Sequence, residues 1–565
     1  AYRKPVVFTK QDQQANALPP DHPSEKGVEG SNNWILSGNK TASGYPIMAN
    51  DPHRSITMPS LRYMVHLVAP GWNVIGGGEP VIPGVSIGHN EFGAWGLTIF
   101  ETDGEDLYVY DLNPENLDQY RYKNQWVSMT KIQDTIKVKG ARDEYVTLRY
   151  TRHGPVAFID SVNHKGYAIR CAWLEPGGAP YLASLRMNQA RNWKDFREAC
   201  RYSHIPAENM IWADRKGNIG WQAVGIAPVR KNFSGLVPVP GDGRYEWDGY
   251  LDILKRPHLY NPAKGFFATA NQNVTPENYT HWNAIGFTWS DPFRGNRINE
   301  VLQTDKRFTI ADNIALQADY FSIPARSLVP LLREIALPAG PMEEAQKHLL
   351  NWDFVLEENS VAAGIYAMWE RKLMAQAAVS FIPRDIRGLV EFQLTTLVGW
   401  LRQPGARFGE DSLRNRDAFL LTTLHQAVEE LTKRFGPEQE AWVYGQSGYK
   451  HASFFHPLDA LLTQEEKALY NLGPLPRGGN SHSPNSTGGL DRQGSGASFR
   501  IITDLQDWDK TLMINAPGQS SDPQSRYYRN LYEIWAGNQY FPAYYSREKI
   551  QANVEEQTIL SPRSR

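Results

Sequence analysis

The chain has 565 residues, of which 41% are hydrophobic, so it is long enough to bury a large core or to form two to four domains. Its 59 Lys and Arg residues nearly balance 61 Asp and Glu residues, and this balance argues against nucleic acid or an anionic membrane surface as a partner. The sequence contains no run of about 18 apolar residues, so it predicts no membrane span. The two cysteines, Cys171 and Cys200, allow one disulfide or none.

The first 30 residues predict an exposed linker. Residues 16–27 are polar and proline-rich, and they have neither helical nor strand periodicity. Exposed linkers are the segments at which chains are cut. From residue 31 to about 226, short strands alternate with Gly, Pro and Asn turns. We expect strands over residues 33–36, 46–49, 62–68, 93–100, 107–112, 135–138, 145–150 and 168–173, and one helix over about 180–201.

The second half of the chain is mainly helical. After a turn-rich segment and a strand-like segment at 265–271, apolar residues recur at helical spacing. We expect helices over residues 309–319, 325–335, 343–351, 362–378 and 412–434, and returning strands over 497–505 and 511–515. This order predicts one mixed α and β body in which early and late strands share sheets. Residues 478–496, rich in Gly, Ser and Asn, predict a long loop that is functional or mobile.

Ser31, in the stretch Gly30-Ser31-Asn32-Asn33-Trp34, could act as both nucleophile and base after one peptide bond is cut. Cleavage of the Gly30–Ser31 bond would give it both a hydroxyl and a free α-amino group. Such an amine, with an ordinary pKa of about 7.7 to 8.0, can act as the base that activates the hydroxyl. While the bond is whole, the nitrogen is an amide and cannot do so. Considered by itself, the same stretch is a polar turn before a strand.

Gly84-Val85-Ser86-Ile87-Gly88 is a rival motif, because it has the Gly-x-Ser-x-Gly spacing of the α/β-hydrolase nucleophile elbow. That elbow needs a helix after its serine, whereas a strand-like segment, residues 94–99, follows here. The two glycines are therefore interpreted as turn or close-packing positions.

Three isolated residues have a candidate role and a structural alternative. His53 lies 22 residues beyond Ser31, and a lone histidine is more often structural than catalytic. Asn271 can offer a side-chain amide to an oxyanion. Arg297 can depress the pKa of a nearby ammonium group or hold a carboxylate, and its alternative is a structural ion pair.

Asp103, Glu105 and Asp106 gather three carboxylates just after a predicted strand. Such a cluster suits a hard cation such as Ca2+, although the spacing is not that of an EF-hand. The alternative is a solvated acidic turn.

Several short segments occur in a fixed order along the chain. They are Ser31-Asn32-Asn33-Trp34, Asn50-Asp51-Pro52-His53, Pro83-Gly84, Gly88-His89-Asn90, Ala94-Trp95-Gly96, Asn271, Arg297, Gly496-Ala497-Ser498-Phe499-Arg500, Asp507-Trp508, Asn515-Ala516-Pro517-Gly518-Gln519-Ser520 and Asp522-Pro523. In order and spacing they resemble the penicillin acylase family of N-terminal nucleophile hydrolases, over nearly the whole chain.

The resemblance implies an α+β fold, the αββα four-layer sandwich of two stacked antiparallel sheets covered by helices, with a large helical insertion at about 305–470. The family is made as a precursor that cuts itself. Residues 31–565 then correspond to the β subunit, and residues 1–30 to the tail of the α subunit or a spacer peptide. The rest of the α subunit is the expected partner, and the expected location is periplasmic or secreted.

The resemblance also implies site residues. Ser31 would be freed by a cut after Gly30, and the oxyanion would be held by the Asn271 amide and the backbone N–H of Ile99. His53 aligns with a Gln or His that contacts the nucleophile and the substrate amide. Arg297 would orient and tune the amine. Asp103, Glu105 and Asp106 align with the Ca2+ loop of penicillin G acylases, so we expect a structural Ca2+ and no organic cofactor.

The expected substrate is a small N-acyl compound, penicillin-type or related. The positions of the acyl pocket align with Arg54, Ile87, Ser184 and Glu208, so the aromatic side chains that embrace a phenyl group are missing. We expect Arg54 and Glu208 to pair, because a lone buried charge is costly; recognition of a polar acyl group is the alternative. The other functions considered are a broad amidase for aliphatic or polar acyl groups, an acyl-homoserine lactone acylase and a catalytically silent scaffold.

Overall fold

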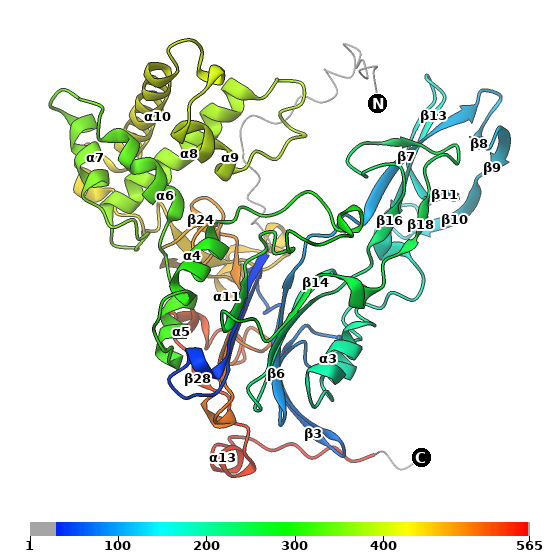
Figure 1. Ribbon diagram of the computed structural model, residues 1–565, viewed down its shortest axis with the longest axis horizontal. Coiled ribbons are helices and arrows are strands. Elements are labelled where there is room, and N and C mark those ends of the chain that lie inside the picture. The colour runs from blue at the N-terminus through cyan, green and yellow to red at the C-terminus, as the bar shows by residue number, and fades with distance from the viewer. Residues whose placement is uncertain (1–29, 563–565) are drawn as a thin grey trace.

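The structure is a computed structural model that describes residues 30–562; the predicted linker lies outside the described residues except for Gly30. Two facing antiparallel sheets form the centre, with a helical lobe on one side and a β lobe on the other (Figure 1). The α+β sandwich expected from the sequence is confirmed.

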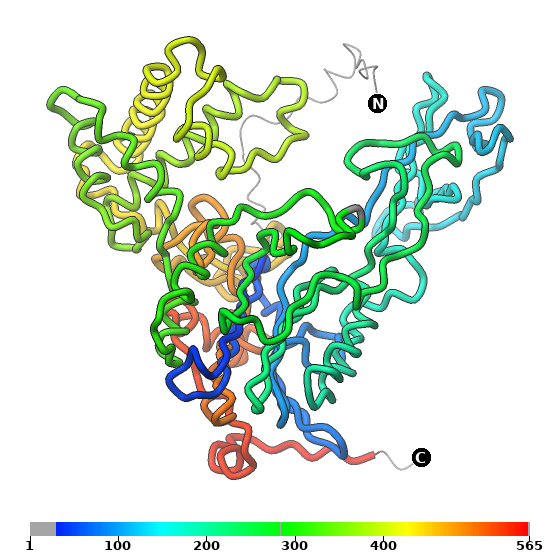
Figure 2. Tube along the Cα trace, in the orientation of Figure 1, coloured from blue at the N-terminus to red at the C-terminus, as the bar shows by residue number. Residues whose placement is uncertain are grey.

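The first sheet is built from both ends of the chain. The blue N-terminal strands lie beside orange and red C-terminal segments (Figure 2), as the prediction of shared sheets required. Its strands are, in order, β20 (Phe266–Thr269), β1 (Gly30–Leu36), β2 (Ile47–Ser55), β26 (Phe499–Asp504), β27 (Leu512–Asn515) and β28 (Phe541–Pro542), with β25 (Ser495–Ala497) beside β2 and β23 (Thr487–Gly488) beside β25. All seven residues of β1 are buried, because the strand is paired on both sides and covered on both faces.

The second sheet packs on the first. Its strands are, in order, β19 (His258–Tyr260), β15 (Ile219–Ala223), β14 (Glu208–Asp214), β6 (Gly93–Ile99), β5 (Ile87–Asn90), β4 (Trp72–Gly78) and β3 (Tyr63–Ala69). A strand, β5, follows Ser86 where an elbow would need a helix. An added Cβ at Gly88 would lie 2.1 Å from the Ile75 carbonyl oxygen, so this glycine is a close-packing position.

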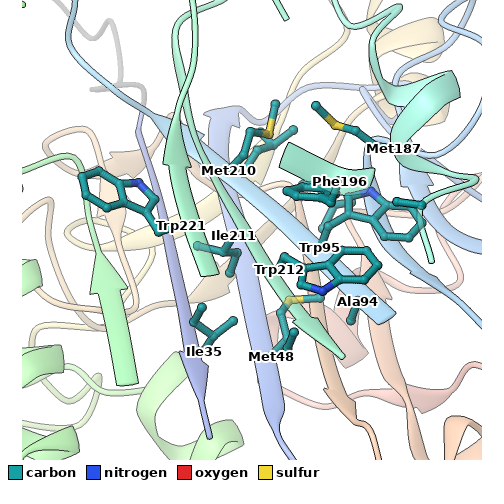
Figure 3. Packing of buried hydrophobic residues seen from close by; sticks show 14 of the residues in the cluster. Ile35, Met48, Ala94, Trp95, Met187, Phe196, Met210, Ile211, Trp212 and Trp221 are labelled. Carbon is teal, nitrogen blue, oxygen red and sulfur yellow. The ribbon is translucent and has the colours of Figure 1, made fainter. Parts of the chain in front are cut away.

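Alternating side chains of the strands fill the layers of the sandwich. Ile35 and Met48 of the first sheet belong to the same core cluster as Ile211 of the second (Figure 3). Trp34 and Leu36, on the other face of β1, pack with the helices α4 (Phe293–Leu302) and α5 (Ile310–Gln317). These contacts place one helical layer outside the first sheet.

The outer face of the second sheet is covered by α2 (Ser184–Met187) and α3 (Trp193–Cys200), with Phe196 of α3 against Trp212 of β14. One helix over 180–201 was predicted, and the structure has two short ones. The break occurs because Asn192 leaves the helical conformation and caps α3 by accepting a hydrogen bond from the Asp195 N–H.

The helical lobe has a core of its own. Its helices are α6 (Ile323–Leu328), α7 (Pro341–Leu350), α8 (Val361–Phe381), α9 (Leu394–Arg402) and α10 (Ser412–Phe435). Pro330 lies in a 3-10 turn that ends the predicted helix at 325–335 early. Beyond this lobe lie α11 (Gln464–Tyr470), α12 (Tyr532–Ala536), α13 (Arg547–Ala552) and the small sheet of β21 (His451–Phe454), β22 (Leu472–Pro476) and β24 (Arg492–Gln493).

The β lobe is a third large sheet. Its strands are β7 (Glu105–Asn113), β8 (Asn116–Tyr122), β9 (Gln125–Ser128), β10 (Thr130–Ile136), β11 (Glu144–Thr151), β12 (Gly154–Asp160), β13 (Lys165–Cys171) and β17 (Val239–Pro240). The ribbon β16 (Pro228–Arg230) and β18 (Trp247–Tyr250) lies beside it (Figure 1).

Cys171 and Cys200 are both free thiols. Between residues 30 and 562, none of the helices has the length and apolar character needed to span a membrane.

Candidate active site

Ser31 lies at the start of β1 and only 2% of its surface is exposed. Its Oγ accepts hydrogen bonds from the Ile99 N–H at 3.2 Å and from Asn271 Nδ2 at 3.3 Å. The two groups expected as oxyanion donors therefore converge on the hydroxyl oxygen. Fixed N–H donors in a buried site stabilise an oxygen on which negative charge develops.

Asn271 follows strand β20 and also holds the Ser31 nitrogen. Its Oδ1 accepts a hydrogen bond from the Ser31 N–H at 2.8 Å, while its Nδ2 also donates to the Ile99 carbonyl oxygen at 3.1 Å. The backbone of Asn271 has φ of 72°, a left-handed conformation that asparagine tolerates better than most residues. This turn aims both ends of one amide at the nucleophile.

The guanidinium beside Ser31 belongs to Arg294, and not to Arg297 as we expected. Arg294 Nη1 donates to the Ser31 carbonyl oxygen at 3.1 Å, and Nη2 donates to Asn271 Oδ1 at 2.9 Å. Burial lowers the pKa of Arg294 to about 10, so the group is charged at neutral pH. Arg297 forms ion pairs with Asp319 at 2.7 Å and Glu300 at 3.3 Å. The two arginines are one helical turn apart on α4, so their side chains reach different partners.

His53 lies in β2, where its main chain is opposite Gly30 in the strand register. Its Nε2 is 2.7 Å from Asp51 Oδ2, which also accepts from Asn32 Nδ2 at 2.9 Å. Burial lowers the pKa of His53, although Asp51 opposes the shift, so the ring is held neutral. The described contacts of this ring are thus to Asp51 and Asn32, the residues beside the nucleophile.

The segment 478–496 has two unexpected properties. Much of it is buried, and it contributes the short strands β23 and β24. The Pro484 carbonyl oxygen accepts a hydrogen bond from Asn32 Nδ2 at 2.8 Å. Arg294 Nη1 binds the oxygen of the same Asn32 amide at 2.7 Å. This loop therefore helps to fix the residue next to Ser31.

The four residues aligned with the acyl pocket lie on four different elements. Ile87 begins β5, Ser184 begins α2 and Glu208 begins β14; all three are buried, whereas Arg54 on β2 is only partly buried. Within residues 30–562, neither carboxylate oxygen of Glu208 has a hydrogen-bond partner. The expected pairing with Arg54 is therefore not a hydrogen-bonded ion pair.

The predicted calcium ligands are engaged by Arg230. Its Nε donates to Asp106 Oδ2 at 2.8 Å, and its Nη2 donates to Asp103 Oδ1 at 3.2 Å. Glu105 accepts from the Cys171 thiol at 3.2 Å. In the described part of the chain, no three His, Cys, Asp or Glu side chains form a group that could hold a metal ion. These residues do not fit the expected Ca2+ site, and no step below uses one.

Two stacked antiparallel sheets between helices, with a serine at the start of a central strand, define the N-terminal nucleophile hydrolase fold. The chain belongs to the penicillin amidase family, whose model matches residues 3–552. The thermostable penicillin G acylase from Alcaligenes faecalis has the same fold, with a TM-score of 0.77 and 23% sequence identity over 94% of this chain and 100% of that one.

Curated relatives carry two kinds of name. The acyl-homoserine lactone acylase QuiP of Pseudomonas aeruginosa is 28% identical over 569 residues, which cover 91% of this chain and 66% of the relative. The penicillin acylase 2 proenzyme of Pseudomonas sp. is 28% identical over 95% of this chain and 70% of the relative. The chain thus spans about two thirds of the length of these relatives.

Proposed function

We propose that this protein is an amidohydrolase that cleaves N-acyl amides through an acyl-enzyme on Ser31. The observation that carries the proposal is the convergence of the Ile99 N–H and Asn271 Nδ2 on Ser31 Oγ, with the Ser31 nitrogen bound to the other end of the Asn271 amide. Nucleophile, base and oxyanion donors thereby occupy one buried place.

The first step is cleavage of the Gly30–Ser31 bond by the chain itself. Ser31 Oγ attacks the Gly30 carbonyl carbon, the C–N bond breaks, and the hydroxyl proton passes to the nitrogen, which gives an ester and an amine. Water then hydrolyses the ester and leaves a carboxylate on Gly30. A Cβ at residue 30 would lie 2.8 Å from Asn271 Oδ1, so glycine suits this crowded position.

In turnover, the freed amine takes the proton of its own hydroxyl, directly or through a water molecule, while Oγ attacks the substrate amide carbonyl. The proton then goes to the leaving nitrogen as the substrate C–N bond breaks. Water hydrolyses the acyl-enzyme and restores the hydroxyl. The Arg294 charge disfavours protonation of the amine, because two cations at close range repel.

The proposal includes a partner and a location. The remainder of the precursor would supply an α subunit, since about a third of each relative's length lies outside the matched part and one of the relatives is named a proenzyme. Family membership favours a periplasmic or secreted location. The second candidate activity is acyl-homoserine lactone acylase, favoured by relatives of that name that match 91% of the chain.

Intact-mass measurement of the purified full precursor tests the proposal. We expect a fragment that begins at Ser31, and hydrolysis of at least one member of a panel of phenylacetyl, glutaryl, fatty-acyl and homoserine-lactone amides. Ser31→Ala should abolish both the cut and the hydrolysis. The matched control, Ser86→Ala, removes the hydroxyl of the rival motif and should retain both. Hydrolysis by Ser31→Ala, or a wild-type chain that stays whole and inactive, would contradict the proposal.

A further inference from the structure

Glu208 is a carboxyl group whose burial is not compensated by the fold. The residue is 0% exposed, and neither Oε1 nor Oε2 has a hydrogen-bond partner in the described part of the chain. Buried polar groups in folded proteins are nearly always hydrogen-bonded, and a buried carboxylate is more costly to leave unpaired than a neutral group. A buried carboxyl group without a hydrogen-bond partner indicates that its partner is a group on a bound ligand.

The main chain of Glu208 lies beside a residue that contacts the nucleophile. Glu208 is directly opposite Ile99 in the pairing of β14 with β6, and the Ile99 N–H is one of the donors to Ser31 Oγ. Glu208 shares a face of β14 with Trp212, because side chains two and four residues apart point the same way. Helix α3 covers that face through Phe196.

A second buried polar group without a hydrogen-bond partner lies in the layer between the second sheet and its helices. Ser184, the first residue of α2, has a buried Oγ with no hydrogen-bond partner among residues 30–562. The chain enters α2 through Tyr181, and burial, together with the negative charge of Glu208, raises the pKa of its phenol. Two polar groups without partners thus line the region between the second sheet and its helices.

Charged neighbours do not neutralise Glu208. Burial raises the pKa of Glu208 to about 7, against the opposing effect of Arg54 and Arg62. Arg62 is engaged elsewhere, by Glu79 at 3.1 Å and by the Ser498 hydroxyl at 3.1 Å. At neutral pH the carboxyl group is therefore partly ionised and has the capacity to accept a hydrogen bond from a donor.

We propose that Glu208 determines specificity by accepting a hydrogen bond from an ammonium group carried on the acyl part of the substrate. The proposal rests on the proposed function and names its substrate class. An ionised carboxylate can only accept, and a cationic donor offsets its burial best, since charge-assisted hydrogen bonds are the strongest. A purely apolar acyl chain would leave Glu208 unpaired in the complex.

Matched substrates test this inference. They are p-nitroanilides of unbranched acyl chains of two to six carbons, each with a methyl or an amino terminus, assayed on the processed enzyme. At one chain length, wild type should prefer the amino terminus. Glu208→Gln should lower kcat/KM for that substrate about 10- to 100-fold and change the methyl-terminated one less than about threefold. Glu208→Leu should reverse the preference.

The pH dependence gives an independent readout. The amino preference of wild type should shrink from pH 8 to pH 6, as Glu208 gains its proton, whereas the preference of Glu208→Gln should be flat. Glu115→Gln, at an exposed acid of the β lobe, is the control and should behave as wild type. A cooperative melting transition and complete processing establish that each variant is folded.

Two results would overturn the inference and leave the proposed function standing. One is a wild-type preference for methyl termini at every length that Glu208→Gln does not alter. The other is a preference for carboxylate-terminated chains, which would make Glu208 a donor instead of an acceptor. If a fully processed wild-type enzyme cleaves none of the amides, the proposed function itself fails.

Discussion

Arg294 and Arg297 leave helix α4 one turn apart and end in different environments. Arg294 is 4% exposed and binds Ser31, Asn32 and Asn271, whereas Arg297 lies against Asp319, Glu300 and the ring of Phe321. Both side chains are guanidinium cations, so charge alone does not distinguish their functions. Their positions on the helix distinguish them.

Replacement of each arginine by leucine therefore gives a matched comparison. Arg294→Leu should slow hydrolysis at least about tenfold and move the acid limb of the pH–rate profile to higher pH, because an amine without a nearby cation holds its proton more tightly. Arg297→Leu should leave the profile in place. The measurement is kcat/KM between pH 5 and 9. An unshifted profile in Arg294→Leu would show that this charge does not tune the amine.

Glu208 should also make stability depend on pH. Its pKa is raised from 4.5 to about 7 in the folded state, so the unfolded chain releases this proton at lower pH than the folded chain. Folding is then penalised progressively as pH rises from about 4.5 to 7, by about 3 kcal/mol in full.

The melting temperature of Glu208→Gln, relative to wild type, should accordingly rise between pH 4.5 and pH 8. Glu115→Gln should keep a constant difference from wild type over the same range. A constant difference for Glu208→Gln as well would mean that Glu208 has an ordinary pKa.

At this scale the family resemblance named Ser31, Ile99 and Asn271, which the structure brings together. It selected Arg297 in place of Arg294, since both lie in one short stretch that was not recognised as a helix. Gly295 and Asn296 are poor helix formers and weaken the helical pattern there. The missing partners of Glu208 depend on packing, which no motif reports.

At the scale of the elements, Arg230 links the ribbon strand β16 to the loop that leads into β7. Its guanidinium binds Asp103 and Asp106, and the Trp247 indole N–H also donates to Asp106. The cation that these acids require is thus supplied by a side chain of the same chain. The sequence could not reveal this, because Arg230 is more than 120 residues away from the acids it binds.

We expect the melting temperature of the wild-type protein to be unchanged by EGTA. Arg230→Leu should destabilise the protein by about 3 kcal/mol, because it leaves two carboxylates without a cation. Lys231→Leu, at an exposed residue that pairs with Asp248, should cost less than about 1 kcal/mol. A fall of the wild-type melting temperature in EGTA that Ca2+ reverses would restore the calcium site.

The elements with the strongest periodicity were predicted well, and those that depend on distant contacts were not. Helices α8 and α10 lie within a few residues of their expected bounds. Segment 478–496 was expected to be a loop from its composition. Its hydrogen bond with Asn32 depends on a distant neighbour that no local pattern identifies.

For the whole molecule, the first sheet depends on segments separated by hundreds of residues. Strand β2 pairs with β1 on one side and with β26 and β25 on the other. The sequence predicted this sharing from strands that return after the helices. The β lobe was not predicted as a separate body, because a strand pattern does not say which sheet a strand joins.

Truncation should therefore have effects that depend on this sheet. A precursor that ends at residue 490 lacks β25, β26 and β27, which leaves β2 without its second neighbour, so we expect neither processing nor a cooperative melting transition. A precursor that ends at residue 553 loses residues 554–562, all of which are exposed, together with 563–565, and it should process normally. Efficient processing of the shorter chain would show that the site forms without the late strands.

Strand β1 is paired on both sides, with Ser31 opposite Pro52 and Asn33 opposite Thr269. A chain end is ordinarily the part of a protein that frays first. Here the end would be created inside a finished sheet, after its neighbours are already in place. An aminopeptidase would find no loose residue to remove, so the new amino terminus, on which the proposed chemistry depends, would be protected from trimming for as long as the sheet is folded.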